Sequence, residues 1–119
     1  MALAGALALT LAGAMPAAAK DGDVIRRGSC SAGAEWKLKL SPGNGRIEVE
    51  YEVDSNVNGQ TVRVKIFKDG NRIFRGNRTT SGPSGSFDLR LVTSDTAGTD
   101  TFRARATNAG QTCTGRASF

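Results

Sequence analysis

One short stretch of this chain has oxygen-bearing side chains at the spacing of a calcium loop: Asp54-Ser55-Asn56-Val57-Asn58-Gly59. Side-chain oxygens at positions one, three and five, followed by a glycine, open an EF-hand loop. That loop also needs flanking helices and a bidentate Glu at position twelve, where this chain has Lys65. The pattern therefore favours a connection between strands, with Gly59 at positive φ, over a weak calcium site. We predict no metal ligand and no cofactor.

Three glutamates, Glu48, Glu50 and Glu52, alternate along one strand-like segment and are the candidates for acid–base chemistry. Neighbours on one strand face lie roughly 6.5 to 7 Å apart, which falls in the range of an inverting glycosidase pair. Alternation in the preceding segment places Lys37 and Lys39 opposite them, which predicts a solvated charge ladder. A catalytic acid also needs partial burial. The chain has no His, which excludes Ser–His and Cys–His nucleophiles, and we predict no catalytic residue and no enzymatic activity.

The N-terminal segment indicates export. Residues 1–19, MALAGALALTLAGAMPAAA, carry no charge and are almost wholly Ala, Leu and Gly. The apolar run is short for a membrane span, and Ala17 and Ala19 form the A-x-A pattern of a signal-peptidase site. We therefore predict a signal peptide over residues 1–19 and one secreted domain over residues 20–119, with no integral membrane segment after cleavage. An N-terminal anchor is the alternative, since no basic residue precedes the apolar run.

Two cysteines, Cys30 and Cys113, lie near the two ends of the predicted mature chain. In an exported protein without His, two cysteines indicate one disulfide in preference to a metal site or a redox pair. A bridge that closes so long a loop stabilises the fold by about 4 to 5 kcal/mol in the chain-entropy model.

The remainder of the chain shows period-two alternation of apolar and polar residues, with turn signals at short intervals. Alternation with one polar face per strand predicts antiparallel sheets packed face to face. The predicted fold is an all-β, immunoglobulin-like sandwich of seven or eight strands, and a Greek-key sandwich of another strand order is the alternative. The predicted strands are residues 35–40, 46–53, 61–67, 72–79 at an edge, 87–92, 101–107 and 111–119, with an eighth near 24–30.

Several short motifs, in their order and spacing, resemble a family of small exported actinobacterial proteins. The motifs are GSC, EWKLKLSP, DSNVNGQ, GPSGSF, RARATN and CTG, which span nearly the whole predicted mature chain. The resemblance implies export and a single β-sandwich domain, and it implies no particular activity.

The chain carries a net charge of +5, and alternation concentrates this charge on one sheet. In an immunoglobulin-like order, the strands that begin after Gly59, Asp100 and Gln111 share one sheet. Their outward charged residues are all basic: Arg63, Lys65, Arg103, Arg105 and Arg116. Arg72 and Arg75 on the edge hairpin extend this surface, and Phe67, with Phe74, is the aromatic expected beside it. In the other sheet, Glu48, Glu50 and Glu52 face Lys37, Lys39 and Arg90, which nearly balances the charge.

A one-sided basic surface attracts polyanions, and the arginine fork suits phosphate. The sequence therefore predicts a secreted, non-enzymatic binding module whose basic sheet face contacts anionic cell-wall or extracellular polymers. The alternative is a protein-binding module, such as a secreted inhibitor, that acts through loops such as SPGNG at 41–45 or GPSGSF at 82–87.

Overall fold

The computed structural model describes residues 22–119, so the predicted signal peptide over residues 1–19 lies outside the described residues. The described chain contains eight β-strands and no helix, and therefore no helix that could cross a membrane. The strands are β1 (Val24–Ser29), β2 (Glu35–Gly43), β3 (Arg46–Asp54), β4 (Thr61–Lys68), β5 (Asn71–Thr79), β6 (Ser86–Ser94), β7 (Thr101–Asn108) and β8 (Gln111–Ser118).

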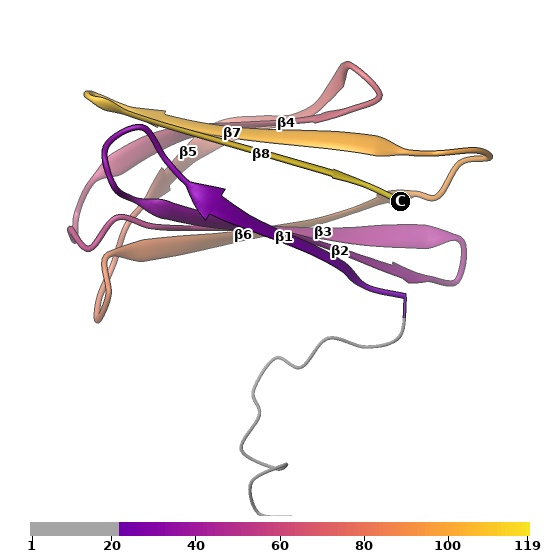
Figure 1. Cartoon of the computed structure of the whole chain (residues 1–119), viewed down its shortest axis with the longest axis horizontal. Coiled ribbons are helices and arrows are strands. Elements are labelled where there is room, and N and C mark those ends of the chain that lie inside the picture. The colour runs from indigo at the N-terminus through magenta and orange to yellow at the C-terminus, as the bar shows by residue number, and fades with distance from the viewer. Residues whose placement is uncertain (1–21) are drawn as a thin grey trace, which may run out of the picture.

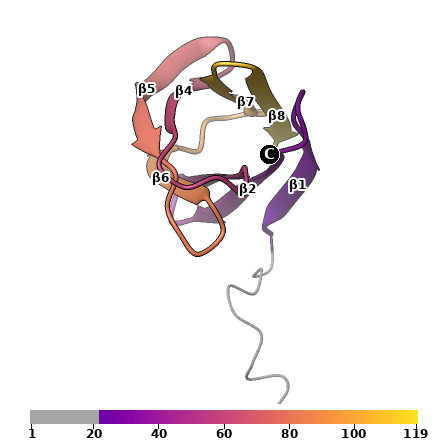
Figure 2. The ribbon, with the colours of Figure 1, turned by 90° about the vertical axis from the view of Figure 1, so that its left-hand side faces the viewer.

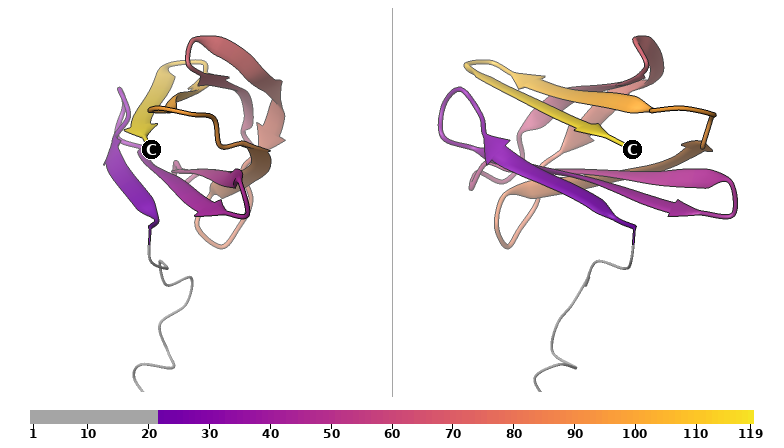
Figure 3. Two further views of the ribbon diagram at one scale, coloured as in Figure 1. Left: turned by 90° about the vertical axis from the view of Figure 1, so that its right-hand side faces the viewer. Right: turned by 45° about the vertical axis from the view of Figure 1, so that its right-hand side comes forward.

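The strands form two antiparallel four-stranded sheets, which lie as two layers in Figure 1. One sheet has the order β1-β2-β3-β6 and the other has the order β5-β4-β7-β8. The chain changes sheets after β3, after β5 and after β6 (Figure 3). In an end-on view, β1 lies beside β8 on one flank and β5 beside β6 on the other (Figure 2). This is the predicted immunoglobulin-like sandwich, with β1 added next to the strand that normally forms the edge of its sheet.

The predicted alternation places the core between the two sheets. Along β3, Ile47, Val49, Tyr51 and Val53 are buried, while the residues between them face solvent or lie half-buried. The Tyr51 hydroxyl donates a hydrogen bond to the Cys113 carbonyl at 3.1 Å, so the largest buried polar side chain has a partner. Core residues from the other strands include Leu38, Leu40, Val62, Val64, Ile66, Phe87, Leu89, Phe102, Ala104, Ala106 and Ala117.

Trp36 occupies the flank of the sandwich where β1 meets β8. A Cβ atom added to Gly28 on β1 or to Gly115 on β8 would stand 2.7 Å from the indole ring. The ring therefore fills the space that both glycines leave open. The predicted Cys30–Cys113 disulfide closes the same flank, because it joins the end of β1 to the buried face of β8.

Two local features differ from the predicted elements. Residues 41–43 belong to β2, and the turn into β3 is confined to Asn44 and Gly45, both at positive φ. A bulge between Ile66 and Phe67 sets the register of the β4–β5 hairpin. It places Phe74 opposite Ile66 on the inward side and leaves Ile73 exposed.

Candidate functional site

The stretch from Asp54 to Gly59 connects the two sheets and is held by hydrogen bonds within the protein. The Asp54 carboxylate accepts the Asn56 backbone N–H at 3.1 Å, and Gly59 has a φ of 80°. The Gly59 N–H donates to the Thr80 carbonyl at 2.7 Å. Within residues 22–119, no group of three or more His, Cys, Asp or Glu side chains is arranged to hold a metal ion. The one carboxylate of the stretch therefore serves the turn.

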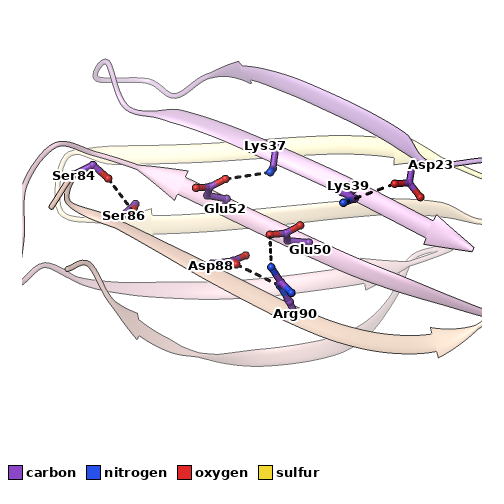
Figure 4. A network of polar contacts seen from close by, with 9 residues as sticks. All are labelled: Asp23, Lys37, Lys39, Glu50, Glu52, Ser84, Ser86, Asp88 and Arg90. Atoms are coloured by element: carbon purple, nitrogen blue, oxygen red, sulfur yellow. Dashed lines mark hydrogen bonds and ion pairs between the residues drawn. The ribbon is translucent and has the colours of Figure 1, made fainter. Parts of the chain in front are cut away.

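The predicted charge ladder lies on the outer face of the β1-β2-β3-β6 sheet (Figure 4). Lys37 is directly opposite Glu52 and Lys39 is directly opposite Glu50. The Lys37 amine lies 3.4 Å from the Glu52 carboxylate, while the Lys39 amine reaches Asp23 at 3.7 Å. This surface therefore neutralises much of its own charge through ion pairs between neighbouring strands.

Glu50 and Asp88 are neighbouring carboxylates of this ladder, and both lie against the Arg90 guanidinium. Arg90 lies 3.3 Å from the Glu50 carboxylate and 3.4 Å from that of Asp88. Partial burial, a hydrogen bond to Glu50 and the charge of Glu50 raise the pKa of Asp88 to about 6. Partial burial alone would raise the pKa of Glu50, but the hydrogen bond from Asp88 and the nearby cations Lys37, Arg90 and Lys39 hold it below its ordinary value.

The raised pKa of Asp88 predicts that the stability of the fold depends on pH. The pKa of Asp88 is about 6 in the folded state and about 3.9 in the unfolded chain, so the folded state binds more protons between these values. Stability therefore falls as pH rises through this window. Asp88→Asn keeps a hydrogen-bond donor beside Glu50 and removes the charge, so we expect it to stabilise the protein above pH 6. Because the Asp88 side chain is 41% exposed, the gain is at most about 1 kcal/mol.

The measurement is urea unfolding of both proteins at pH 4 and at pH 7.5. Below the Asp88 pKa the two free energies of unfolding should coincide, since the wild-type carboxyl is then protonated. A variant that is less stable than the wild type at pH 7.5 would contradict the assignment.

A hollow of about 440 Å³ lies at the start of β2, and neither Glu50 nor Asp88 is among its lining residues. Its lining residues are Arg27, Gly28, Ser29, Glu35, Trp36, Lys37, Glu52 and Asp54. Of its three carboxylates, that of Glu52 is paired with Lys37 and that of Asp54 accepts a backbone N–H. Asp88, whose carboxyl has the raised pKa, lies directly opposite Glu52 of the hollow's lining but does not itself line the hollow.

The opposite sheet carries seven cations on its outer face, here called the basic face. They are Arg63 and Lys65 of β4, Arg72 and Arg75 of β5, Arg103 and Arg105 of β7, and Arg116 of β8. The register places them in rows that cross the strands. One row is Arg72–Phe67–Arg103–Arg116 and the next is Arg75–Lys65–Arg105. All five residues predicted for this surface, and both predicted extensions, therefore share one face.

The charges of the basic face are uncompensated within the described part of the chain. None of the seven cations has an ion pair within 4.0 Å among residues 22–119, since the ion pairs there involve other residues. Lys68, also on β4, differs because its amine donates to the Ser94 carbonyl at 2.8 Å and lies 3.8 Å from Asp100. Like charges that stand directly opposite each other across strands destabilise a sheet, as at Lys65 between Arg75 and Arg105.

Phe67 differs from the sequence prediction. It was expected to be an exposed aromatic, but it is only half-exposed, and the Arg103 guanidinium lies over its ring at 4.2 Å from the centroid. Phe74 is half-buried against the core, under Arg78 at 5.2 Å. Neither ring is a bare stacking platform. Alternation placed Phe67 and Arg103 on one face, but only the strand register brings them together.

Sequence reasoning missed the role of Asp88, although its alternation with the buried Phe87 and Leu89 already placed it outward with Arg90. The missing information was the pairing of β6 with β3. The two loops considered for protein binding lie apart, because the β2–β3 turn and the loop before β6 are at opposite ends of the antiparallel β3–β6 pair.

Comparisons of the chain with protein-family models, curated proteins and solved structures find no match. The functional conclusion therefore depends on the geometry and charge of this chain alone.

Proposed function

We propose that this protein is an exported, non-enzymatic module that binds anionic polymers of the cell envelope or its surroundings through the basic face. The observation that carries the proposal is the set of seven cations on one sheet face, with no acidic residue among the outward positions of its strands. Cations on one face sum into a potential that attracts linear polyanions and releases their counterions.

The opposite face supports this assignment by contrast. There, lysines and arginines pair with carboxylates from adjacent strands, so that face offers little net field. The basic face gains most from an external anion, because its like-charged neighbours repel each other until an anion lies between them. Binding would therefore also stabilise the fold, by linkage between the folded state and the ligand.

The test compares two triple variants that remove the same charge. Arg63→Ser/Arg103→Ser/Arg105→Ser removes three cations of the basic face, and Arg26→Ser/Arg27→Ser/Arg46→Ser removes three exposed arginines from β1 and β3 of the other sheet. Affinity for a phosphodiester polymer is measured at several salt concentrations.

We expect the basic-face variant to bind one to two orders of magnitude more weakly, since each arginine near an anionic partner contributes up to about 1 kcal/mol. The slope of its log affinity against log salt concentration should become less negative by about 2, because each of the three lost contacts contributes about 0.7 to the slope. The control variant should stay close to the wild type. Equal losses in both variants would refute the proposal, and salt-resistant capture of one protein partner would favour the loop-mediated alternative.

A further inference from the structure

The two rows of cations on the basic face differ in how firmly their arginines are held. In the first row, Arg103 stacks on Phe67 at 4.2 Å and stands directly opposite Arg116 on β8. In the second row, Arg105 stands opposite Thr114 and has no aromatic beneath it. A stacked guanidinium has fewer orientations to lose on binding, so Arg103 is preorganised and Arg105 is not.

Arg103 and Arg116 face each other with no carboxylate between them. Opposed residues on antiparallel strands have Cα atoms about 4.5 to 5.5 Å apart. The Arg103 guanidinium lies over Phe67 on the β4 side of β7, so Arg116 must extend across β7 from β8 for the two guanidinium groups to share one small anion. The two charged oxygens of a phosphodiester are tetrahedrally arranged, so their lone pairs point in several directions and can accept from two arginines that approach from different sides. A carboxylate keeps its acceptor sites in one plane, so a second arginine must approach in the plane of the first. This geometry therefore suits phosphate better than carboxylate.

We infer that Arg103 and Arg116, with Phe67 positioning the first, form a phosphate site that holds one phosphodiester group of a linear polymer. This inference rests on the proposed function and names its ligand chemistry. The polymer would run across the strands, along the row from Arg72 to Arg116, because that is the direction in which cations follow one another.

The contact between Arg103 and Phe67 also determines which part of a nucleic acid this surface does not recognise. Base stacking needs a bare ring, and the Arg103 guanidinium covers the ring of Phe67. The face therefore recognises the phosphodiester backbone and is indifferent to nucleobases. An abasic phosphodiester oligomer and an oligonucleotide of equal length should bind with equal affinity.

The experiment substitutes residues without changing charge. Arg103→Lys/Arg116→Lys removes both forks and the stack, and Arg63→Lys/Arg105→Lys is the matched control on the same face. Phe67→Leu removes the ring beneath Arg103, and Phe67→Tyr keeps it. Affinity for the abasic oligomer, for the oligonucleotide and for polyglutamate is measured on variants whose folded state is verified by circular dichroism.

We expect Phe67→Leu to bind both phosphodiester ligands two- to fivefold more weakly, the loss that corresponds to an exposed cation–π contact. The salt dependence should not change, because the number of charges is constant, and Phe67→Tyr should restore affinity. Arg103→Lys/Arg116→Lys should lose at least as much affinity as Phe67→Leu. Arg63→Lys/Arg105→Lys, which keeps two further charges of the same face, should lose less affinity than either. Polyglutamate should bind more weakly than either phosphodiester at equal charge.

Three outcomes would overturn the inference and leave the proposed function standing. Equal losses of affinity in Arg103→Lys/Arg116→Lys and in Arg63→Lys/Arg105→Lys would show that the face recognises charge alone. A loss in Phe67→Leu that is confined to the oligonucleotide would show that Phe67 stacks bases. Equal affinity for polyglutamate would remove the preference for phosphate. A wild-type protein that binds no polyanion at any salt concentration would instead refute both proposals.

Discussion

Removing the Cys30–Cys113 disulfide is expected to lower the free energy of unfolding by about 4 kcal/mol, the largest single effect predicted for this fold. The bridge joins residues 83 positions apart, so it restricts nearly the whole described chain in the unfolded state. A domain of this size is stable by about 5 to 15 kcal/mol in total. The protein without the bridge should therefore be only marginally stable.

The measurement is urea unfolding of the oxidised protein, of the reduced protein and of Cys30→Ser/Cys113→Ala. Alanine is chosen at position 113 because Cys113 is buried and a hydroxyl there would need a partner. The reduced wild type controls for lost side-chain volume, since it keeps both sulfur atoms. The dependence on urea should also steepen, because the unfolded chain is less compact without the bridge. A loss below about 1 kcal/mol would contradict the entropic account.

The location of the bridge explains why this flank depends on it. The β1–β8 flank is filled by Trp36, whose ring lies against Gly28 and Gly115. Neither glycine contributes side-chain packing, so the sheets are linked on this side by the indole, the disulfide and hydrogen bonds between the β1–β2 connection and β8. One of these bonds runs from the Ser31 N–H to the Thr112 carbonyl at 2.9 Å. On the opposite flank, Phe74 is half-buried against the core and helps to cover the space between β5 and β6.

Alternation along the sequence was sufficient to predict the strands and the inward faces of most of them. The pairing of the two cysteines was predicted from their number in a chain expected to be exported. It succeeded because each strand buries one face, as along β3, where a shift of one residue would expose Tyr51 and bury Glu50. The same property assigned five of the seven cations to one face, since the faces of β4, β7 and β8 follow from their buried residues. Arg72 and Arg75 share that face only because of the bulge in the β4–β5 hairpin.

Contacts between strands that are not neighbours in the chain were beyond that reasoning, because they depend on strand register. The bulge at Ile66 and Phe67 turns Phe74 inward, and no residue type in the hairpin signals it. The Arg103–Phe67 contact arises from β4–β7 pairing, and the contacts of Arg90 with Glu50 and Asp88 arise within the β3–β6 pair, whose strands are far apart in the chain. The contact on which the proposed phosphate site depends is therefore one that a single sequence conceals.

The two faces of the sandwich differ in how their charges are balanced. On the outer face of the β1-β2-β3-β6 sheet, ion pairs such as Lys37–Glu52 relieve repulsion internally. On the basic face, the repulsion between the opposed residues Arg103 and Arg116 is not offset by a carboxylate. This repulsion destabilises the fold, and a bound anion would reduce it. We therefore expect phosphate-bearing ligands to raise the melting temperature through the basic face.

Gly85→Ala is expected to destabilise the fold by about 3 kcal/mol or more, through a clash with backbone and a strained φ together. Gly85 has a φ of 74°, and a Cβ atom built there would lie 2.2 Å from the Val57 nitrogen. Its carbonyl also accepts the Ser55 N–H at 2.9 Å. The substitution must therefore push apart the β3–β4 and β5–β6 connections, both of which carry the chain between sheets.

Gly98→Ala is the matched control, because Gly98 has a φ of 82° and a Cβ atom there would meet nothing within 4 Å. It should cost only the conformational term, about 1 kcal/mol. Urea unfolding gives both values, and hydrogen exchange at Ser55 and Thr80, whose amides hold the two loops, locates the damage. Equal losses at Gly85 and Gly98 would mean that the loops separate without cost. The stretch from Asp54 to Gly59 would then not be the rigid link between the ion-paired sheet and the basic face that its hydrogen bonds indicate.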